Sequence, residues 1–79
     1  MELWQERVIQ EKKELDEKII KLQTFIDGEE IKTIDETESL RLEVQLTLMQ
    51  GYSNILEARI TSWDLQTSAI EGDAPKTGQ

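Results

Sequence analysis

The chain has 79 residues, of which 17 are acidic and 9 basic, so its formal net charge is −8. It contains neither cysteine nor histidine, which excludes disulfides, thiolate or imidazole metal sites and the commonest catalytic base and nucleophile pairs. The acidic balance argues against binding to DNA or RNA, because nucleic-acid binding needs a basic surface. No apolar run approaches the about 20 residues of a membrane span, and no signal peptide is visible. We therefore expect an intracellular protein without membrane contact.

The segment Trp4–Ile26 contains no glycine or proline and consists mostly of good helix formers. Its apolar residues follow one another at steps of three, four or seven, which places them on one side of a helix. They are Trp4, Val8, Leu15, Ile19, Leu22 and Ile26. We expect a first helix over about residues 3–27, with Glu14–Lys18 and Glu17–Lys21 as ion pairs along its surface. Gly28 is suited to a left-handed conformation just after its last turn.

Residues 28–35 form the expected connector, and two starts of the second helix compete. Asp35 and Glu38 are spaced as in a capping box, and so are Thr33 and Glu36, two residues earlier. The sequence leaves both starts open.

The next segment carries two patterns. Leu40, Leu42, Val44, Leu46 and Leu48 alternate with polar residues, which is typical of a half-buried strand. No second run alternates well enough to pair with such a strand, whose backbone would lack hydrogen-bond partners. The same leucines also continue into helical stripes, so we predict a helix over about 36–68.

That helix would be apolar on two nearly opposite faces. One stripe comprises Leu42, Leu46, Met49, Leu56, Ile60 and Trp63, and the other comprises Leu40, Val44, Leu48, Tyr52 and Ile55. The first helix can cover only one of these stripes, so the other should meet another protomer or a ligand. The predicted fold is an all-α helical hairpin over residues 1–70 that forms a homo-oligomer, followed by a disordered tail over 71–79. Gly51, inside the second helix, indicates either a close approach by another group or simple tolerance.

Five side chains are candidates for binding a nucleotide-like anion, because aromatic rings stack on bases and cationic groups neutralise phosphate. They are Trp4, Arg7, Lys18, Tyr52 and Arg59. Each has an alternative role: the two rings as core or interface residues, Arg7 as a partner of Glu11, and Arg59 as an ion-pair partner across an interface. No Ca²⁺ loop, phosphate-binding loop or dinucleotide fingerprint is present. We expect no catalysis, no cofactor and no metal.

Two motifs together resemble a known family. The first helix carries QxRVxxExxxLxxKxxKLxxFI, from Gln5 to Ile26, and the second carries QLxxMxxYxxILxxRI, from Gln45 to Ile60. The combination resembles the hairpin domain of bacteriophage anti-CBASS proteins, which certain phage anti-Thoeris proteins share. The resemblance covers about residues 4–63.

The resemblance implies a small helical sponge in the cytoplasm of an infected bacterium. Such proteins assemble as hexamers and sequester cyclic oligonucleotide messengers, such as 3′,3′-cGAMP, without cleaving them, so the CBASS effectors are not activated. It implies that Lys18 and an aromatic ring near the N-terminus hold a cyclic dinucleotide; the position of that ring falls at Leu3 or Trp4, and Trp4 is the aromatic residue there. Arg7 is assigned to the same site because it shares a helix face with Lys18, not because of the resemblance. Arg59, beside Tyr52, would serve a second pocket that takes cyclic trinucleotides.

A different class of function competes with this one. A coiled-coil-like adaptor would dock a host or phage protein on its exposed apolar stripe. It would remain a monomer or dimer until that partner arrived.

Overall fold

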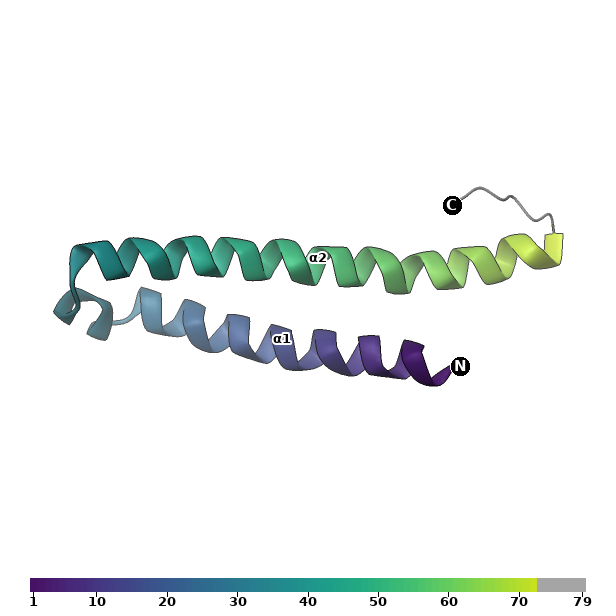
Figure 1. Cartoon of the computed structure of the whole chain (residues 1–79), viewed down its shortest axis with the longest axis horizontal. Coiled ribbons are helices and arrows are strands. Elements are labelled where there is room, and N and C mark those ends of the chain that lie inside the picture. The colour runs from purple at the N-terminus through teal and green to yellow at the C-terminus, as the bar shows by residue number, and fades with distance from the viewer. Residues whose placement is uncertain (73–79) are drawn as a thin grey trace.

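A computed structural model describes the backbone of residues 1–72 and the side chains of residues 1–63. The chain forms helix α1 (Leu3–Asp27), a short 3₁₀ helix η1 (Glu30–Thr33) and helix α2 (Glu36–Gly72). The two long helices run antiparallel, side by side (Figure 1). The described part of the chain contains no strand, so the predicted all-α hairpin is confirmed and the alternation over residues 40–48 belongs to a helix.

Side chains near the first residues of α1 and α2 form hydrogen bonds with backbone N–H groups that have no partner within the helix. At the start of α1 the side-chain oxygen of Gln5 accepts a hydrogen bond from the backbone N–H of Glu2, at 2.8 Å. At the start of α2 the carboxylate of Asp35 accepts from the N–H of Glu38, at 3.3 Å. The hydroxyl of Thr33 instead donates to the carbonyl of Glu30, at 2.7 Å, inside η1. Asp35 is therefore the residue that caps α2.

Gly28 ends α1 in a conformation different from the expected one. Its φ of −92° and ψ of −167° are extended, so the prediction of a left-handed glycine is wrong. Its N–H donates to the carbonyl of Phe25 at 3.2 Å, and a Cβ at this position would lie 3.3 Å from the carbonyl oxygen of Thr24. A close approach to the last turn, rather than a positive φ, is what favours glycine here.

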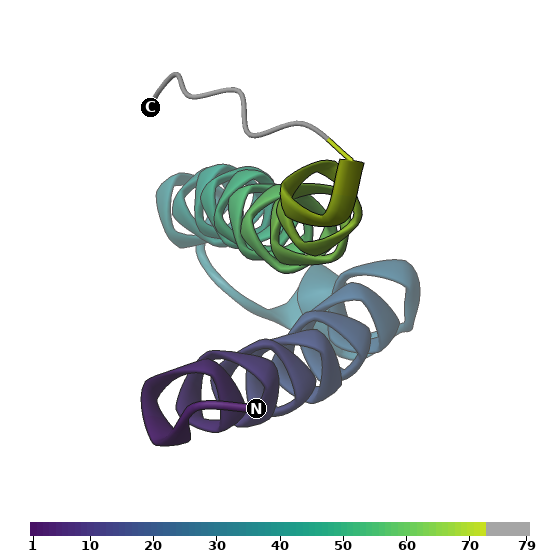
Figure 2. The ribbon, with the colours of Figure 1, turned by 90° about the vertical axis from the view of Figure 1, so that its right-hand side faces the viewer.

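The core is a single seam between the helices. Val8, Leu15, Leu46 and Leu56 are its buried apolar residues, and Leu56 is the most enclosed, at 1% exposure. Ile19, Met49, Ile60 and Trp63 pack around this seam. Viewed from its end, the molecule shows two long helices, one above the other and inclined to each other (Figure 2). Such a hairpin covers the first stripe of α2 and leaves the second stripe without a covering helix.

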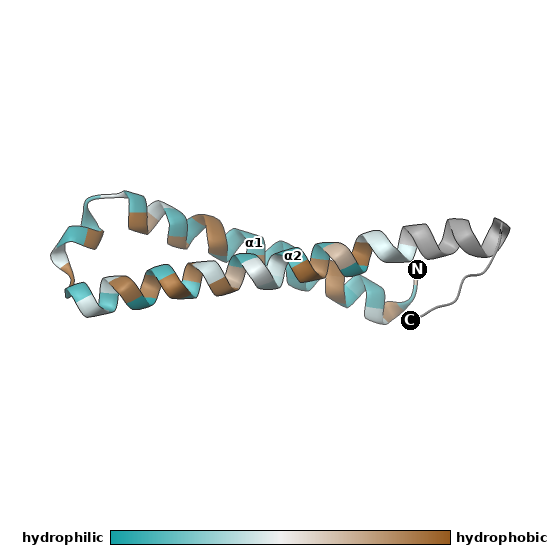
Figure 3. Ribbon diagram, turned by 90° about the horizontal axis from the view of Figure 1, so that it is seen from above, coloured by the Kyte–Doolittle hydropathy of each residue, from teal (hydrophilic) through white to brown (hydrophobic). Residues whose placement is uncertain are grey.

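The second stripe of α2 lies on the uncovered side. Apolar segments recur along both helices (Figure 3), but Leu40, Val44, Leu48 and Ile55 are each more than half exposed. Gly51 lies among them, and a Cβ built on it would meet nothing within 4 Å. We call this exposed surface, formed by Leu40, Val44, Leu48, Gly51 and Ile55, the outer stripe. Within one protomer, no other group approaches Gly51 closely.

Helix α2 is longer at its C-terminal end than the sequence predicted. The helix continues to Gly72, past the expected end near residue 68, so it includes Glu71 and Gly72, which the sequence assigned to the tail. No proline occurs before Pro75 to force an earlier end. The remainder of the expected tail, residues 73–79, lies outside the described residues. None of the described helices is both long and apolar enough to span a bilayer.

Candidate functional site

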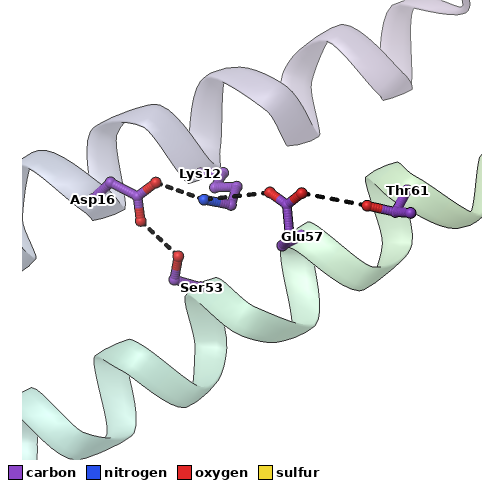
Figure 4. Close-up of polar contacts among 5 residues, drawn as sticks. All are labelled: Lys12, Asp16, Ser53, Glu57 and Thr61. Atoms are coloured by element: carbon purple, nitrogen blue, oxygen red, sulfur yellow. Dashed lines mark hydrogen bonds and ion pairs between the residues drawn. The ribbon is translucent and has the colours of Figure 1, made fainter.

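A polar network joins the two helices on one side of the seam (Figure 4). The ammonium of Lys12 lies 2.6 Å from one carboxylate oxygen of Asp16 and 3.6 Å from the carboxylate of Glu57. The buried hydroxyl of Ser53 donates to the other oxygen of Asp16, at 2.5 Å. Thr61 donates to the second oxygen of Glu57, at 3.3 Å. We call this side of the hairpin, with Lys12, Asp16, Ser53 and Glu57, the network side.

The network changes the proton affinity of two of its members. The hydrogen bond from Lys12, and then that from Ser53, hold the pKa of Asp16 below its ordinary value. The hydrogen bond to Asp16 raises the pKa of Lys12, with a smaller contribution from the charge of Glu57. Both shifts favour the charged forms, as expected for an ion pair with a hydroxyl donor.

The network also fixes which residues of α1 and α2 lie across from each other. Asp16 faces Ser53 and Lys12 faces Glu57, so each turn forward along α1 matches one turn back along α2. The same alignment puts Lys18 across from Tyr52. By helical periodicity of about 100° per residue, Lys18 and Tyr52 fall on the flank opposite the network.

Arg7 and Arg59 fall on this same flank by the same periodicity. Arg7 lies about three turns from Lys18 on α1, and Arg59 lies about two turns from Tyr52 on α2. We call the surface of Arg7, Lys18, Tyr52 and Arg59 the candidate side. Glu11 and Glu14 share this flank of α1, so the surface is mixed rather than purely basic. Four of the five candidate residues from the sequence thus share one side of the hairpin, although they lie far apart along it.

The three cationic candidates are exposed and unpaired within the described part of the chain. Its ion pairs are Lys12–Asp16, Lys12–Glu57, Lys32–Glu29 and Arg41–Glu38. The expected pairs of Lys18 with Glu14 and of Lys21 with Glu17 are absent from this set, and Arg7 does not pair with Glu11. Surface pairs of this kind contribute little, so solvent competes well for both partners. Arg7, Lys18 and Arg59 are therefore exposed cations without an ion-pair partner among the described residues.

Trp4 contributes to the hairpin itself. Its ring meets that of Trp63 edge to face, with centroids 5.0 Å apart and an interplanar angle of 83°. The residue remains 49% exposed. Along α1, Trp4 lies about 21 Å and Arg7 about 16 Å from Lys18. One protomer therefore does not bring Trp4, Arg7 and Lys18 together in a single pocket.

Tyr52 and Arg59 are closer to each other. They lie two turns apart on α2, about 10 Å along the helix axis, and both are exposed. Tyr52, at 45% exposure, stands where the candidate side meets the outer stripe. Its ring is open to a stacking partner from outside the protomer.

The network residues Lys12, Asp16 and Ser53 were not singled out from the sequence, although a signal for them existed. The apolar stripe of α1 makes a step of seven residues from Val8 to Leu15, without a member at the intermediate step of three or four. That of α2 makes the same step from Met49 to Leu56. Lys12 and Ser53 occupy these two gaps, and both bind Asp16. A matched pair of gaps in two stripes that pack together indicates a polar contact across a core.

Comparison with curated proteins and with solved structures gave no match. Comparison with models of protein families gave a match over residues 2–62, to the model described as Sequestin. The matched region contains α1, the connector and α2 as far as residue 62, one residue before Trp63. It also contains both motifs and all five candidate residues. The chain therefore belongs to the Sequestin family, the phage anti-CBASS cyclic-nucleotide sponges that its two helix motifs resemble.

Proposed function

We propose that this protein binds cyclic oligonucleotide messengers of bacterial antiviral defence and holds them without cleaving them. In the cytoplasm of an infected bacterium, this sequestration keeps CBASS effectors inactive. The observation that carries the proposal is the family match, which covers α1, α2 as far as residue 62 and every candidate binding residue. The mode of action is stoichiometric, so it depends on tight binding rather than on turnover.

The candidate side has the chemistry that such a ligand requires. A cyclic dinucleotide such as 3′,3′-cGAMP presents two phosphates and two bases. Phosphates favour Lys and Arg, and bases favour aromatic rings and guanidinium planes. Lys18 and Arg7 are exposed and have no competing ion pair in the described chain. We therefore assign phosphate binding to Lys18, supported by Arg7. We assign base stacking to Trp4, which lies outside the candidate side.

The spacing of these residues supports a ligand held between protomers. Trp4 and Lys18 of one helix are about 21 Å apart, farther than one small cyclic molecule reaches. Trp4 of one copy and Lys18 of another can converge where two copies of α1 meet. The proposal thus includes a homo-oligomer, and we expect a hexamer. Arg59 and Tyr52, on α2, form the second pocket, for cyclic trinucleotides.

Titration calorimetry with a panel of cyclic di- and trinucleotides tests the ligand class. We expect at least one member to bind below micromolar concentration. After heat denaturation of the complex, chromatography should recover the ligand intact, which separates a sponge from an enzyme. The absence of binding across the panel would refute the proposal, and a linearised ligand would replace it with a hydrolase.

Lys18→Glu tests the assignment of the phosphate contact. Replacing a cation by an anion at a phosphate should weaken dinucleotide binding by at least about 30-fold, or about 2 kcal/mol. Lys32→Glu makes the same charge change in the connector and should leave affinity unchanged. Circular dichroism should show equal helicity for both variants. Equal affinity of the Lys18 variant and the parent would remove Lys18 from the site.

The exposed outer stripe favours a second candidate, a helical adaptor for a host or phage protein. Unpartnered apolar surface of this kind marks an interaction site. Light scattering separates the two functions, because a closed assembly of the purified chain supports the sponge. A monomer or dimer that grows only when a partner protein is added supports the adaptor.

A further inference from the structure

The two tryptophans of the chain contact each other where α1 begins. The first turn of α1 lies beside α2, which continues past it (Figure 1). The rings of Trp4 and Trp63 meet there with centroids 5.0 Å apart and planes at 83°. Aromatic rings favour this edge-to-face arrangement, because the positive edge of one meets the negative face of the other. The contact joins the start of α1 to α2.

Trp63 is anchored on the core of the hairpin. Its side chain is partly buried and packs against the cluster of Val8, Leu15 and Leu56. Leu56, two turns earlier on the same helix, is 1% exposed. A side chain in close-packed surroundings keeps one orientation, because its neighbours fill the space that another rotamer would need. Trp63 therefore presents a fixed aromatic surface to the start of α1.

Trp4 receives much less support from its own helix. It is the second residue of α1, and the preceding residue, Leu3, is 62% exposed. The hydrogen bond between Glu2 and Gln5 lies within the first turn, so it does not attach that turn to α2. The first turn of a helix also opens more easily than the rest, because its N–H groups lack carbonyl partners within the helix. Contact with Trp63 therefore limits the positions that the Trp4 ring can take.

The contact with Trp63 leaves Trp4 accessible to a ligand. In an edge-to-face pair each ring keeps at least one face that the other ring does not cover, and Trp4 is 49% exposed. Around the helix, Val8 of the seam lies about 40° to one side of Trp4, and Arg7 lies about 60° to the other. A base stacked on the open part of the ring would therefore have a guanidinium beside it, which suits the attached phosphate.

We propose that Trp63 is a positioning residue of the ligand site, which holds the ring of Trp4 in the orientation that stacks on a base of the bound cyclic nucleotide. This role rests on the proposed function, in which Trp4 stacks on the base. A ring that is already fixed loses less conformational entropy when the ligand binds, so binding is tighter. Trp63 directly follows residues 2–62, so this support lies outside the region that the family match covers.

Two substitutions of Trp63 test the proposal, and both leave Trp4 as the only tryptophan of the chain. Trp63→Phe keeps an aromatic ring against Trp4, whereas Trp63→Leu keeps only an aliphatic side chain on the core. Time-resolved fluorescence anisotropy of the free protein should show a fixed Trp4 ring in the first variant and a faster-moving ring in the second. Circular dichroism checks that both variants keep the helicity of the parent.

The affinity of the same two variants should follow the mobility of the ring. The probe for titration calorimetry is 3′,3′-cGAMP, or another cyclic dinucleotide that the panel shows to bind. Trp63→Leu should bind it about three- to tenfold more weakly than the parent, the cost of ordering one more side chain. Trp63→Phe should restore the affinity of the parent. Leu46→Ala, in the same stripe about 25 Å along α2, is the control and should lower stability without changing affinity.

The deciding comparison repeats Trp63→Leu in a chain that also carries Trp4→Leu. A residue that acts through Trp4 has nothing to position in that chain, so the double variant should bind as well as Trp4→Leu alone. A merely structural role of Trp63 would persist without Trp4, and the double variant would then bind more weakly than the single one. That result would overturn the proposal.

The failure of this role is distinguishable from the failure of the proposed function. If Trp63→Phe and Trp63→Leu are equal in either ring mobility or affinity, the positioning role is overturned and the sponge remains. An affinity loss in Trp63→Leu that accompanies loss of the parent's assembly, measured by light scattering, also overturns it. A parent that binds no member of the panel refutes the proposed function instead. The anisotropy comparison then still decides whether Trp63 holds the ring of Trp4.

Discussion

Two neighbouring residues of α2 illustrate the contrast between its faces. Leu56 is 1% exposed in the seam with α1, whereas Ile55, one residue earlier, is 59% exposed on the outer stripe. Both are large aliphatic residues in the same helical backbone. One helix thus carries two apolar stripes of similar composition, of which the hairpin buries only one.

The contrast shows that α2 carries more apolar surface than one protomer buries. An apolar stripe on a helix contributes to stability only when something covers it. The inner stripe is covered by α1, and the outer stripe requires a surface from outside the chain. The following experiments break or sharpen this contrast, beginning with the largest expected effect.

Leu56→Ala and Ile55→Ala are a matched pair. Truncating Leu56 should remove about 2–5 kcal/mol from the free energy of unfolding, because it leaves a cavity in a very small core. Truncating Ile55 should change the unfolding of the isolated protomer by less than about 0.5 kcal/mol. Urea titration followed by circular dichroism, at several protein concentrations, measures both. Equal losses at the lowest concentration would show that the outer stripe is covered within one protomer.

Ser53→Ala removes the hydroxyl that joins the two helices through Asp16. Hydrogen bonds to charged groups contribute about 1.5–3 kcal/mol, and the partial exposure of Asp16 places this one near the lower end. Thr47→Ala is the control, because that hydroxyl bonds only within its own helix, to the carbonyl of Glu43. Urea titration of both variants measures the difference. A loss equal to that of the control would mean that solvent replaces the interhelical bond at no cost.

Gly51→Ala separates the protomer from its assembly. Alanine is favoured over glycine in a helix by about 1 kcal/mol, and the space around Gly51 is open in the protomer. The hairpin should therefore gain up to about 1 kcal/mol of stability in dilute solution. If another copy approaches the outer stripe at Gly51, the same methyl group should weaken the assembly. Light scattering together with urea titration detects this opposite change.

Acid titration examines the network side. Because the pKa of Asp16 is lowered in the folded state, its stabilisation is complete above the ordinary Asp value of about 3.9. It is lost as the pH falls further, through the folded value. Asp16→Asn should therefore be less stable than the parent at a pH of about 6. The difference in stability between the two proteins should become smaller by a pH of about 3. Thermal unfolding across this range measures the difference, and a constant gap would exclude titration of Asp16 as its source.

The hairpin was predictable because its two helices carry complementary stripes. Leu40–Leu48 also alternates like a strand, but a strand needs a second strand and the chain offers none. The start of α2 was undecidable from spacing, since Thr33 and Asp35 are both acceptable caps. Thr33 lost that role because η1 supplies a nearer acceptor, the carbonyl of Glu30. A short connector helix of this kind leaves little trace in a hydrophobic pattern.

The candidate site was predictable only as a set of residue types. Which of them share a side depends on how α1 and α2 align, and Asp16 with Ser53 sets that alignment. The predicted pair of Lys18 with Glu14 does not form, because an exposed ion pair is barely more stable than its two charges in water. That failure leaves the ammonium of Lys18 exposed for another partner.

The bond from Ser53 to Asp16 also resists sliding of one helix along the other. A shift of α2 by one turn would set Asp16 opposite either Met49 or Glu57. The first choice leaves a carboxylate against an apolar side chain, and the second brings two carboxylates together. Motion along the helix axis is thus opposed in both directions. The same bond therefore also fixes the position of Lys18 on α1 relative to Tyr52 on α2.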